Sequence, residues 1–188
     1  MLAVLGGCDR QSGQNAQQAA SSSLTDAASD KADEAQIGTF DRSHKGSHLP
    51  DLTFTDTDGH PLRLAALTGK PLLLNLWATW CAPCVAELPT LDALAGAKGA
   101  GLQVVAISQD LGEGDALSAK VKDFWQGKGF RHIHPALDPQ GEAASQYQAA
   151  TLPTTIYYDA QGREVWRLTG GHDWSGKDTD KLLAETAG

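Results

Sequence analysis

The sequence predicts an α/β domain in which a mixed β-sheet lies between layers of helices. Short apolar runs, typical of buried strands, alternate with helical segments from about residue 72 onward. The chain then continues with two strands joined by a turn and ends on an amphipathic segment. Alternation of strands and helices followed by a hairpin and a helix indicates a three-layer α/β/α sandwich with a mixed central sheet.

A hairpin is the first element expected in the folded part. Two short apolar strands at 52–55 and 62–64 flank Asp58-Gly59, a dipeptide that favours tight turns. Because this hairpin precedes the alternating region, we expect it as an N-terminal extension of the sheet.

The alternating region follows the hairpin. The nearly continuous apolar run at 72–77 predicts a buried strand, and the segment 85–97 predicts a helix. A second buried strand is expected at 102–108, before a helix at 115–126 that ends close to two glycines. The remaining elements are a short helix at 142–148, strands at 154–158 and 165–169 joined by the turn 159–162, and a helix within 174–187.

Composition restricts the class of protein. The chain has 188 residues, enough for one domain and a tail, and 41% of them are hydrophobic. Its net charge of −8, without a cluster of lysine or arginine, argues against nucleic acid and anionic lipid as partners. No run of 18 apolar residues occurs, so the sequence contains no membrane-spanning segment.

The N-terminal region predicts a lipid anchor followed by a tether. Leu5-Gly6-Gly7-Cys8 resembles a bacterial lipobox, which implies cleavage before Cys8 and acylation of that residue. The apolar run is short and has no basic region before it, so we interpret residues 1–8 as a truncated signal segment. The alternative is an unpaired cysteine in a disordered end. Residues 9–46 are rich in Gln, Ser, Ala and Asp and predict a disordered tether, which leaves residues 47–188 for the folded domain.

Two cysteines with redox spacing occupy the start of the first long helix. In Trp80-Cys81-Ala82-Pro83-Cys84 the thiols stand at i and i+3, where they can form a disulfide, and the helix N-terminus stabilises a thiolate on the first. A zinc site needs two further ligands, and no second CxxC exists. We therefore expect no metal, although Cu(I) held by the two thiols stays open as an alternative.

The motif Trp80-Cys81-Ala82-Pro83-Cys84, together with Leu152-Pro153-Thr154, resembles a thioredoxin-fold protein. The closer similarity is to the TlpA/ResA-like family of extracytoplasmic thiol–disulfide oxidoreductases, over residues 49–183. It implies a thioredoxin-like fold and no cofactor besides the redox-active disulfide. Supporting stretches are residues 74–80, Glu87-Leu88-Pro89, Leu152-Pro153-Thr154-Thr155 and residues 170–174.

Each cysteine has an expected role. Cys81 lies at the exposed helix start and should be the nucleophile, because only a thiolate attacks a disulfide. Cys84 should be less exposed and should resolve the mixed disulfide. The resemblance implies that Glu87 is a buried acid that relays the proton of Cys84, the alternative being a solvated helix glutamate. Asn75 stands where thioredoxin has a titratable aspartate.

The resemblance also implies a cis peptide bond before Pro153, packed against the disulfide. Such a proline leaves the backbone of the preceding residue free to pair with an extended substrate. We expect Trp80 to cover the cysteines as part of the contact surface and Trp77 to lie in the core. The full set of expected substrate contacts is Trp80, Ala82, Pro83, Leu152 and Thr154.

These observations predict a protein-disulfide reductase of the bacterial envelope. It would be a monomer, lipid-anchored at Cys8, most simply to the inner membrane and facing the periplasm. Disulfide-containing proteins are its expected partners. The resemblance implies apocytochrome c or the copper-site proteins of cytochrome oxidase as clients, and a membrane electron donor of the DsbD/CcdA kind. Copper delivery, a thiol oxidase working in the opposite direction and a thiol peroxidase are the alternatives.

Overall fold

Eight strands form one mixed sheet in the part of the chain that this computed structural model describes, residues 38–186. The strands are β1 (Thr39–Asp41), β2 (Thr53–Asp56), β3 (Pro61–Arg63), β4 (Leu72–Trp77), β5 (Gln103–Ser108), β6 (His134–Leu137), β7 (Thr154–Tyr158) and β8 (Glu164–Thr169). Their order across the sheet is β1-β8-β7-β4-β5-β6-β2-β3.

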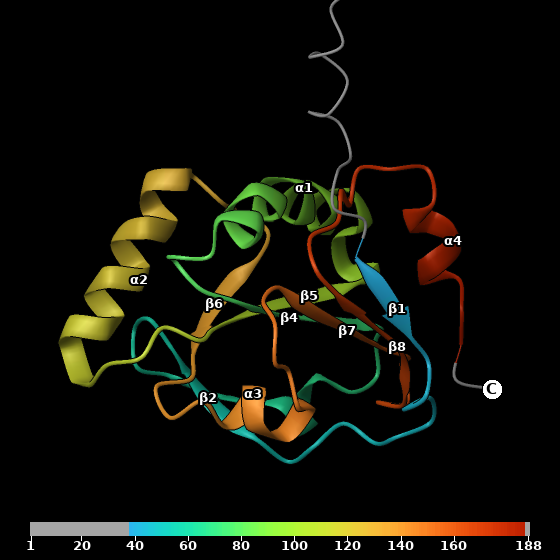
Figure 1. Ribbon diagram of the computed structural model, residues 1–188, viewed down its shortest axis with the longest axis horizontal. Coiled ribbons are helices and arrows are strands. Elements are labelled where there is room, and N and C mark those ends of the chain that lie inside the picture. The colour runs from blue at the N-terminus through green and yellow to red at the C-terminus, as the bar shows by residue number, and fades with distance from the viewer. Residues whose placement is uncertain (1–37, 187–188) are drawn as a thin grey trace, which may run out of the picture. The chain divides into compact units, whose positions relative to one another are not determined.

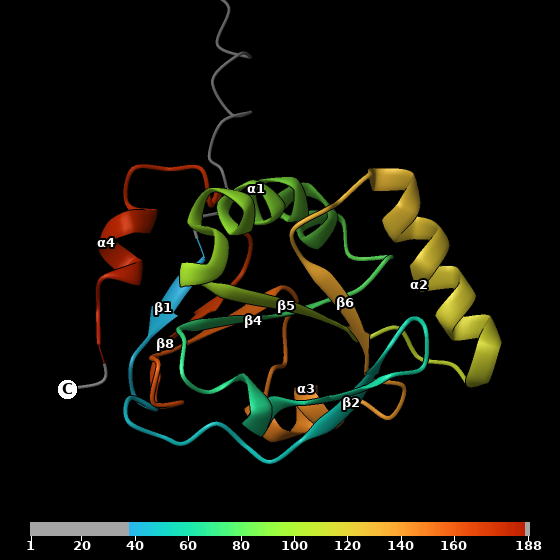
Figure 2. The same ribbon diagram turned by 180° about the vertical axis from the view of Figure 1, so that it is seen from behind.

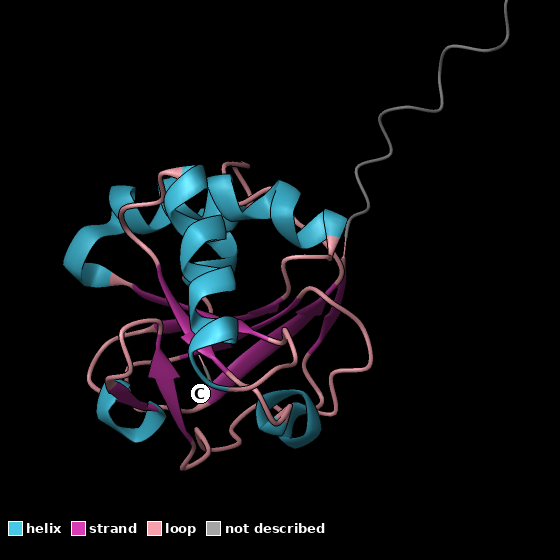
Figure 3. Ribbon diagram, turned by 90° about the vertical axis from the view of Figure 1, so that its left-hand side faces the viewer, coloured by secondary structure: helices cyan, strands magenta, loops and turns pink. Residues whose placement is uncertain are grey.

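Helices cover both faces of this sheet. Figures 1 and 2 show α1, α2 and α4 on one side and α3 on the other, and Figure 3 shows the strands lying between these layers. The expected three-layer α/β/α sandwich is therefore confirmed. The helices are α1 (Ala82–Lys98), α2 (Gly114–Lys128), α3 (Glu142–Tyr147) and α4 (Thr179–Leu183), with 3-10 turns η1 (Leu64–Leu67) and η2 (Gly99–Gly101).

The two faces of the sheet carry two separate apolar clusters, and β4 contributes to both. All six residues of β4 are buried. Because successive side chains of a strand point to opposite faces, Leu73 and Trp77 pack with α1 and α2. Leu72, Leu74 and Leu76 instead pack with α3 and η1. A strand covered on both faces needs a continuous apolar run, and residues 72–77 provide it except at Asn75.

Strand directions bring three chain segments together at one end of the central strands. β4 and β5 are parallel, with Trp77 opposite Ser108. β7 runs antiparallel to β4, with Leu76 opposite Thr154. The C-terminal ends of β4 and β5 and the N-terminal end of β7 therefore lie on the same side of the sheet. In α/β folds, ligands bind at the carboxyl ends of the parallel strands. The CxxC motif directly follows β4.

Two strands were not expected from the sequence. β1 lies within the segment interpreted as a tether, and Thr39 pairs with Thr169 of β8, so the folded domain begins before residue 47. The strand is short and only Phe40 packs against the core, which leaves little signal in the sequence. β6 contains Pro135, a residue that disfavours strand predictions.

The expected hairpin is confirmed as β2 and β3, which pair antiparallel. The other expected strands and helices are found with small changes at their ends, except that the last helix is confined to Thr179–Leu183. The expected signal segment and residues 9–37 of the expected tether lie outside the described residues. Among residues 38–186, no helix has the length and apolar character needed to cross a membrane.

Candidate active site

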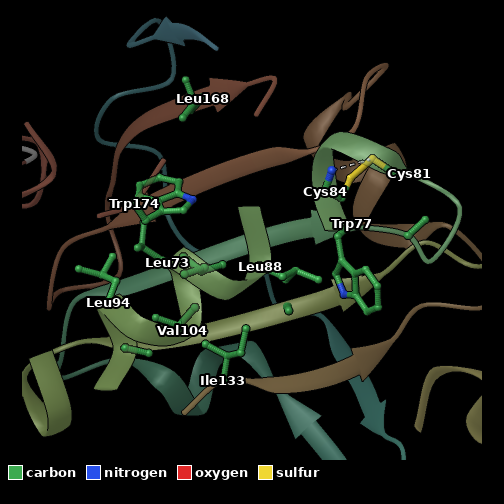
Figure 4. Close-up of a cluster of buried hydrophobic side chains, with 14 of the residues drawn as sticks. Leu73, Trp77, Cys81, Cys84, Leu88, Leu94, Val104, Ile133, Leu168 and Trp174 are labelled. Atoms are coloured by element: carbon green, nitrogen blue, oxygen red, sulfur yellow. Dashed lines mark hydrogen bonds between the residues drawn. A yellow bond between two sulfur atoms is a disulfide. The ribbon is translucent and has the colours of Figure 1, made fainter. Parts of the chain in front are cut away.

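A disulfide joins Cys81 and Cys84 at the start of α1, with their Cα atoms 5.3 Å apart. Cys81 is the N-cap of the helix, and its sulfur accepts a hydrogen bond from the backbone N–H of Cys84 at 3.3 Å. Pro83 lies in the first turn, where a missing N–H costs no helical hydrogen bond. Figure 4 shows the disulfide at the N-terminal end of α1, near the buried core residue Trp77.

The two cysteines differ in exposure in the expected order. Cys81 retains 5% of its surface and Cys84 none, which fits a first cysteine that meets the client and a second that stays inside. Cys81 is more buried than expected for an exposed helix start, because it packs into the core cluster on the α1 side of the sheet. Trp80, by contrast, is 67% exposed beside it.

Glu87 is a buried acid, as the resemblance implies. It lies on α1 one turn after Cys84, at a spacing that places both side chains on one helix face. Its carboxylate accepts hydrogen bonds from Asn75 Nδ2 at 2.7 Å and from the backbone N–H of His172 at 3.0 Å. Burial raises the pKa of Glu87 to about 7, and these two donors oppose that rise. Glu87 can therefore exchange a proton near neutral pH.

Asn75 orients this acid from the middle of β4. Its amide nitrogen also donates to Thr155 Oγ1 at 2.9 Å. Its amide oxygen is buried and finds no donor among the described residues. An asparagine here cannot titrate, so the titratable group of the site lies on α1 rather than on β4.

The segment after β8 closes the site over Glu87. His172 binds the carboxylate through its backbone, and the backbone N–H of Trp174 donates to Thr90 Oγ1 at 3.1 Å. The indole of Trp174 lies near enough to Glu87 to favour its ionised form, although its N–H makes no hydrogen bond of normal geometry within the described residues. Sequence reasoning assigned no role to these two residues. Their backbone contacts leave no signature in side-chain type.

A cavity of about 410 Å³ opens between this segment and α1. Glu87 contributes to its wall, although only 4% of the surface of Glu87 is exposed. The lining residues are Pro83, Ala86, Glu87, Thr90, Gly171, His172 and Asp173.

The peptide bond between Leu152 and Pro153 is cis, as the resemblance implies. Leu152 is half-buried, whereas Thr154 is buried and its hydroxyl donates to the carbonyl of Thr151 at 2.7 Å. The carbonyl of Pro153 accepts from the N–H of Gly170 at 2.9 Å. The loop that enters β7 is thus fixed to β8, and Leu152 is more exposed than Pro153 and Thr154.

Asp110 is a further buried carboxylate that sequence reasoning missed. It follows β5 and is fully buried. It accepts hydrogen bonds from the backbone and the hydroxyl of Thr79, from Ser108 Oγ and from Lys120 Nζ. Although burial opposes ionisation, these bonds hold the pKa of Asp110 below its usual range. Its one sequence signal was the position of an acid two residues after an apolar strand, which does not by itself indicate these contacts.

The Cys81–Cys84 pair is the redox group of the site. Among residues 38–186, no three His, Cys, Asp or Glu side chains are arranged to hold a metal ion. The arrangement combines a dithiol–disulfide pair, a helix N-terminus and a buried acid that titrates near neutral pH. A helix start stabilises the thiolate that attacks in thiol–disulfide exchange, and the acid can take up or release a proton during it.

Comparisons with known proteins agree with this chemistry. The Redoxin family model matches residues 44–183. The thiol-disulfide oxidoreductase ResA of Geobacillus kaustophilus is 33% identical over 126 residues, which cover 66% of this chain and 69% of that protein.

Solved structures show the same fold. The exposed lipoprotein thioredoxin Etrx1 of Streptococcus pneumoniae is 26% identical with a TM-score of 0.62, over 71% of this chain and 98% of that one. A putative thiol:disulfide interchange protein DsbE of Chlorobium tepidum is 25% identical with a TM-score of 0.65, over 74% and 94%. The chain belongs to the Redoxin family and is a thioredoxin-fold thiol–disulfide oxidoreductase of the ResA type.

Proposed function

We propose that the protein is a membrane-anchored reductase of protein disulfides in the bacterial envelope. The observation that carries the exchange chemistry of this proposal is Glu87, a buried acid with a pKa of about 7 placed one helical turn after Cys84. A resolving cysteine must lose its proton before it can attack, and an acid of this pKa can accept that proton at neutral pH.

The reaction consists of two exchanges. The Cys81 thiolate attacks a client disulfide, so that one client sulfur leaves as a thiolate and a mixed disulfide forms. The Cys84 thiol then transfers its proton to Glu87, and its sulfur attacks Cys81 in the mixed disulfide. The second client sulfur leaves, and the Cys81–Cys84 disulfide seen in the structure results. Two electrons pass from the dithiol to the client.

The reducing direction is supported by the residues between the cysteines. The side chains of Ala82 and Pro83 bring no charge or hydrogen-bond donor that would stabilise the reduced thiolate beyond the effect of the helix start. A strongly oxidising site depends on such stabilisation. Clients would be apocytochrome c or the copper-site proteins of cytochrome oxidase, and a membrane electron carrier of the DsbD/CcdA kind would restore the dithiol.

The envelope location is supported from two sides. Cys8 ends a lipobox-like run, and its acylation would hold the domain at the inner membrane on the tether that follows. Etrx1, which shares the fold, is described as an exposed lipoprotein. Mass spectrometry of the native protein tests the anchor. We expect residues 1–7 to be absent and Cys8 to carry lipid, and an unmodified Cys8 behind an intact N-terminus would contradict it.

Trapping of the mixed disulfide tests the reaction. The reduced Cys84→Ser variant should stay covalently bound to a disulfide-containing protein such as insulin, because the resolving thiol is missing. The matched Cys81→Ser variant should trap none, provided that both variants also carry Cys8→Ser, which removes the third thiol. The wild-type dithiol should release reduced insulin. Equal trapping by both variants, or no insulin reduction by the wild type, would contradict the proposed reaction.

A further inference from the structure

Trp80 and Leu111 are the large apolar side chains that the described part of the domain leaves exposed, at 67% and 75%. Other large apolar residues in this region are buried or only partly accessible. Exposed apolar side chains that gather at a functional site mark contact surfaces. Trp80 directly precedes Cys81, so its exposure places an apolar group at the redox site.

Hydrogen bonds between Asp110 and Thr79 hold the loop that carries Leu111 next to the segment that carries Trp80. Thr79 precedes Trp80, and Asp110 precedes Leu111. The Asp110 carboxylate accepts from the Thr79 N–H at 2.8 Å and from the Thr79 hydroxyl at 2.6 Å. The two exposed side chains are therefore carried by neighbouring loops whose preceding residues are bonded to each other.

The loop around Leu111 also lies against α2. Gly112 has a positive φ of 155°, and a Cβ there would lie 3.4 Å from the Cβ of Leu117, a buried residue of α2. Lys120, also on α2, donates to Asp110 at 2.6 Å. Leu111 thus directly follows Asp110, a residue that is bonded both to Thr79 and to α2.

Sheet topology places this pair on a defined side of the disulfide. β4 leads into Cys81, β7 borders β4 on one side and β5 borders it on the other. Pro153 enters β7, and Asp110 follows β5. A client that reaches Cys81 between Pro153 and Asp110 meets the Leu152–Pro153 backbone on one side. On the other side it meets Trp80 and Leu111.

We propose that Trp80 and Leu111 form an apolar rim that binds an apolar side chain next to the reacting cysteine of the client. The rim is continuous with the redox site. The nearby cation, Lys120, is paired with buried Asp110, so it offers little attraction to an acidic client. Asp110 and Thr79 are positioning residues for the rim. This inference rests on the proposed reduction of protein disulfides.

Two synthetic peptides with an intramolecular disulfide test the rim. One carries leucine beside its first cysteine and the other carries serine. Loss of apolar contact at Leu111→Ser should raise KM for the leucine peptide about five-fold, which corresponds to ~1 kcal/mol of lost burial. It should leave kcat, and KM for the serine peptide, unchanged. The matched Leu111→Met variant keeps an apolar side chain and should behave as wild type.

A second variant separates positioning from contact. Thr79→Val removes the hydroxyl bond to Asp110 and keeps both rim side chains. It should raise KM for the leucine peptide selectively, because the loop that carries Trp80 loses one of its two hydrogen bonds to Asp110. An effect of the same size on both peptides would overturn the selective rim. So would an unchanged KM in Leu111→Ser, or a Leu111-dependent affinity for phosphatidylglycerol vesicles without peptide selectivity.

The failure of the rim and the failure of the proposed function give different results. If the wild-type protein reduces neither peptide, the proposed reduction is wrong. If it reduces both, and Leu111→Ser does not distinguish them, only the rim is wrong.

Discussion

Burial and hydrogen bonding act in opposite directions on Glu87. Burial favours the neutral acid, whereas the donors on Asn75 and His172 favour the carboxylate. The balance leaves the pKa at about 7, the range in which a general acid–base group is most useful at neutral pH. Asn75 has a specific part in this balance, because its amide nitrogen reaches both Glu87 and Thr155.

Replacing the amide donor should shift this balance upward. Asn75→Leu removes the N–H at 2.7 Å from Glu87 while roughly keeping side-chain volume, so the pKa of Glu87 should rise further. Carbon-13 NMR titration of the Glu87 carboxyl measures it. Thr155→Val is the control, since it removes an acceptor from Asn75 but leaves the donor to Glu87. A Glu87 pKa unchanged in Asn75→Leu would show that the amide does not tune the acid.

At the scale of elements, Asp110 connects β5, the loop between β4 and α1, and α2. Its partners Thr79, Ser108 and Lys120 come from these three segments. A buried carboxylate with several donors is costly to alter, because its partners then lose their acceptor.

Asp110→Asn should therefore destabilise the domain by about 3 kcal/mol, a value near the low end for a buried pair because Lys120 remains partly exposed. Urea unfolding of the oxidised protein measures the loss. Lys122→Ala is the comparison, because its pairing with Asp58 is on the surface and should contribute less than about 1 kcal/mol. Equal losses of unfolding free energy in the two variants would mean that the hydrogen bonds of buried Asp110 contribute no more than a surface ion pair.

Elements with a strong local pattern could be predicted from the sequence, and elements held by their neighbours could not. The apolar run of β4 and the CxxC spacing at α1 carry their own signal. β1 has one packed apolar residue and depends on its pairing with β8, while β6 contains Pro135. The cis bond at Pro153 followed from the family resemblance alone.

Across the whole molecule, the site combines segments that are far apart in the chain. Glu87 meets Asn75 at 12 residues' separation and His172 at 85. The two cysteines could be predicted from residue type and spacing, and the buried acid followed from the family resemblance. The closing segment at His172–Trp174 and the tie at Asp110 could not, because they act through backbone contacts and through tertiary neighbours.

The stability of the whole domain should depend on pH through the titration of Glu87. A pKa raised from 4.5 to about 7 means that the folded state binds this proton more tightly than the unfolded state. This tighter binding contributes about 3 kcal/mol to the free energy of unfolding. The contribution is complete below about pH 4.5 and is lost as pH rises to 7. His172, whose pKa is lowered by burial, acts in the opposite direction below pH 6.5.

The difference between wild type and Glu87→Gln isolates this carboxyl, because His172 is common to both. Urea unfolding between pH 4 and 8 should show wild type losing stability relative to Glu87→Gln as pH rises. A difference that does not change with pH would mean that Glu87 titrates near its ordinary value in the folded protein.

The midpoint potential of the Cys81–Cys84 couple tests the central claim most directly. Equilibration with glutathione buffers at pH 7, followed by thiol alkylation, measures it. We expect a reducing couple near that of thioredoxin, about −270 mV, so that electrons flow from Cys81 and Cys84 to the client. A value close to that of the strong oxidant DsbA, about −120 mV, would reverse the direction of electron flow and contradict the reductase account.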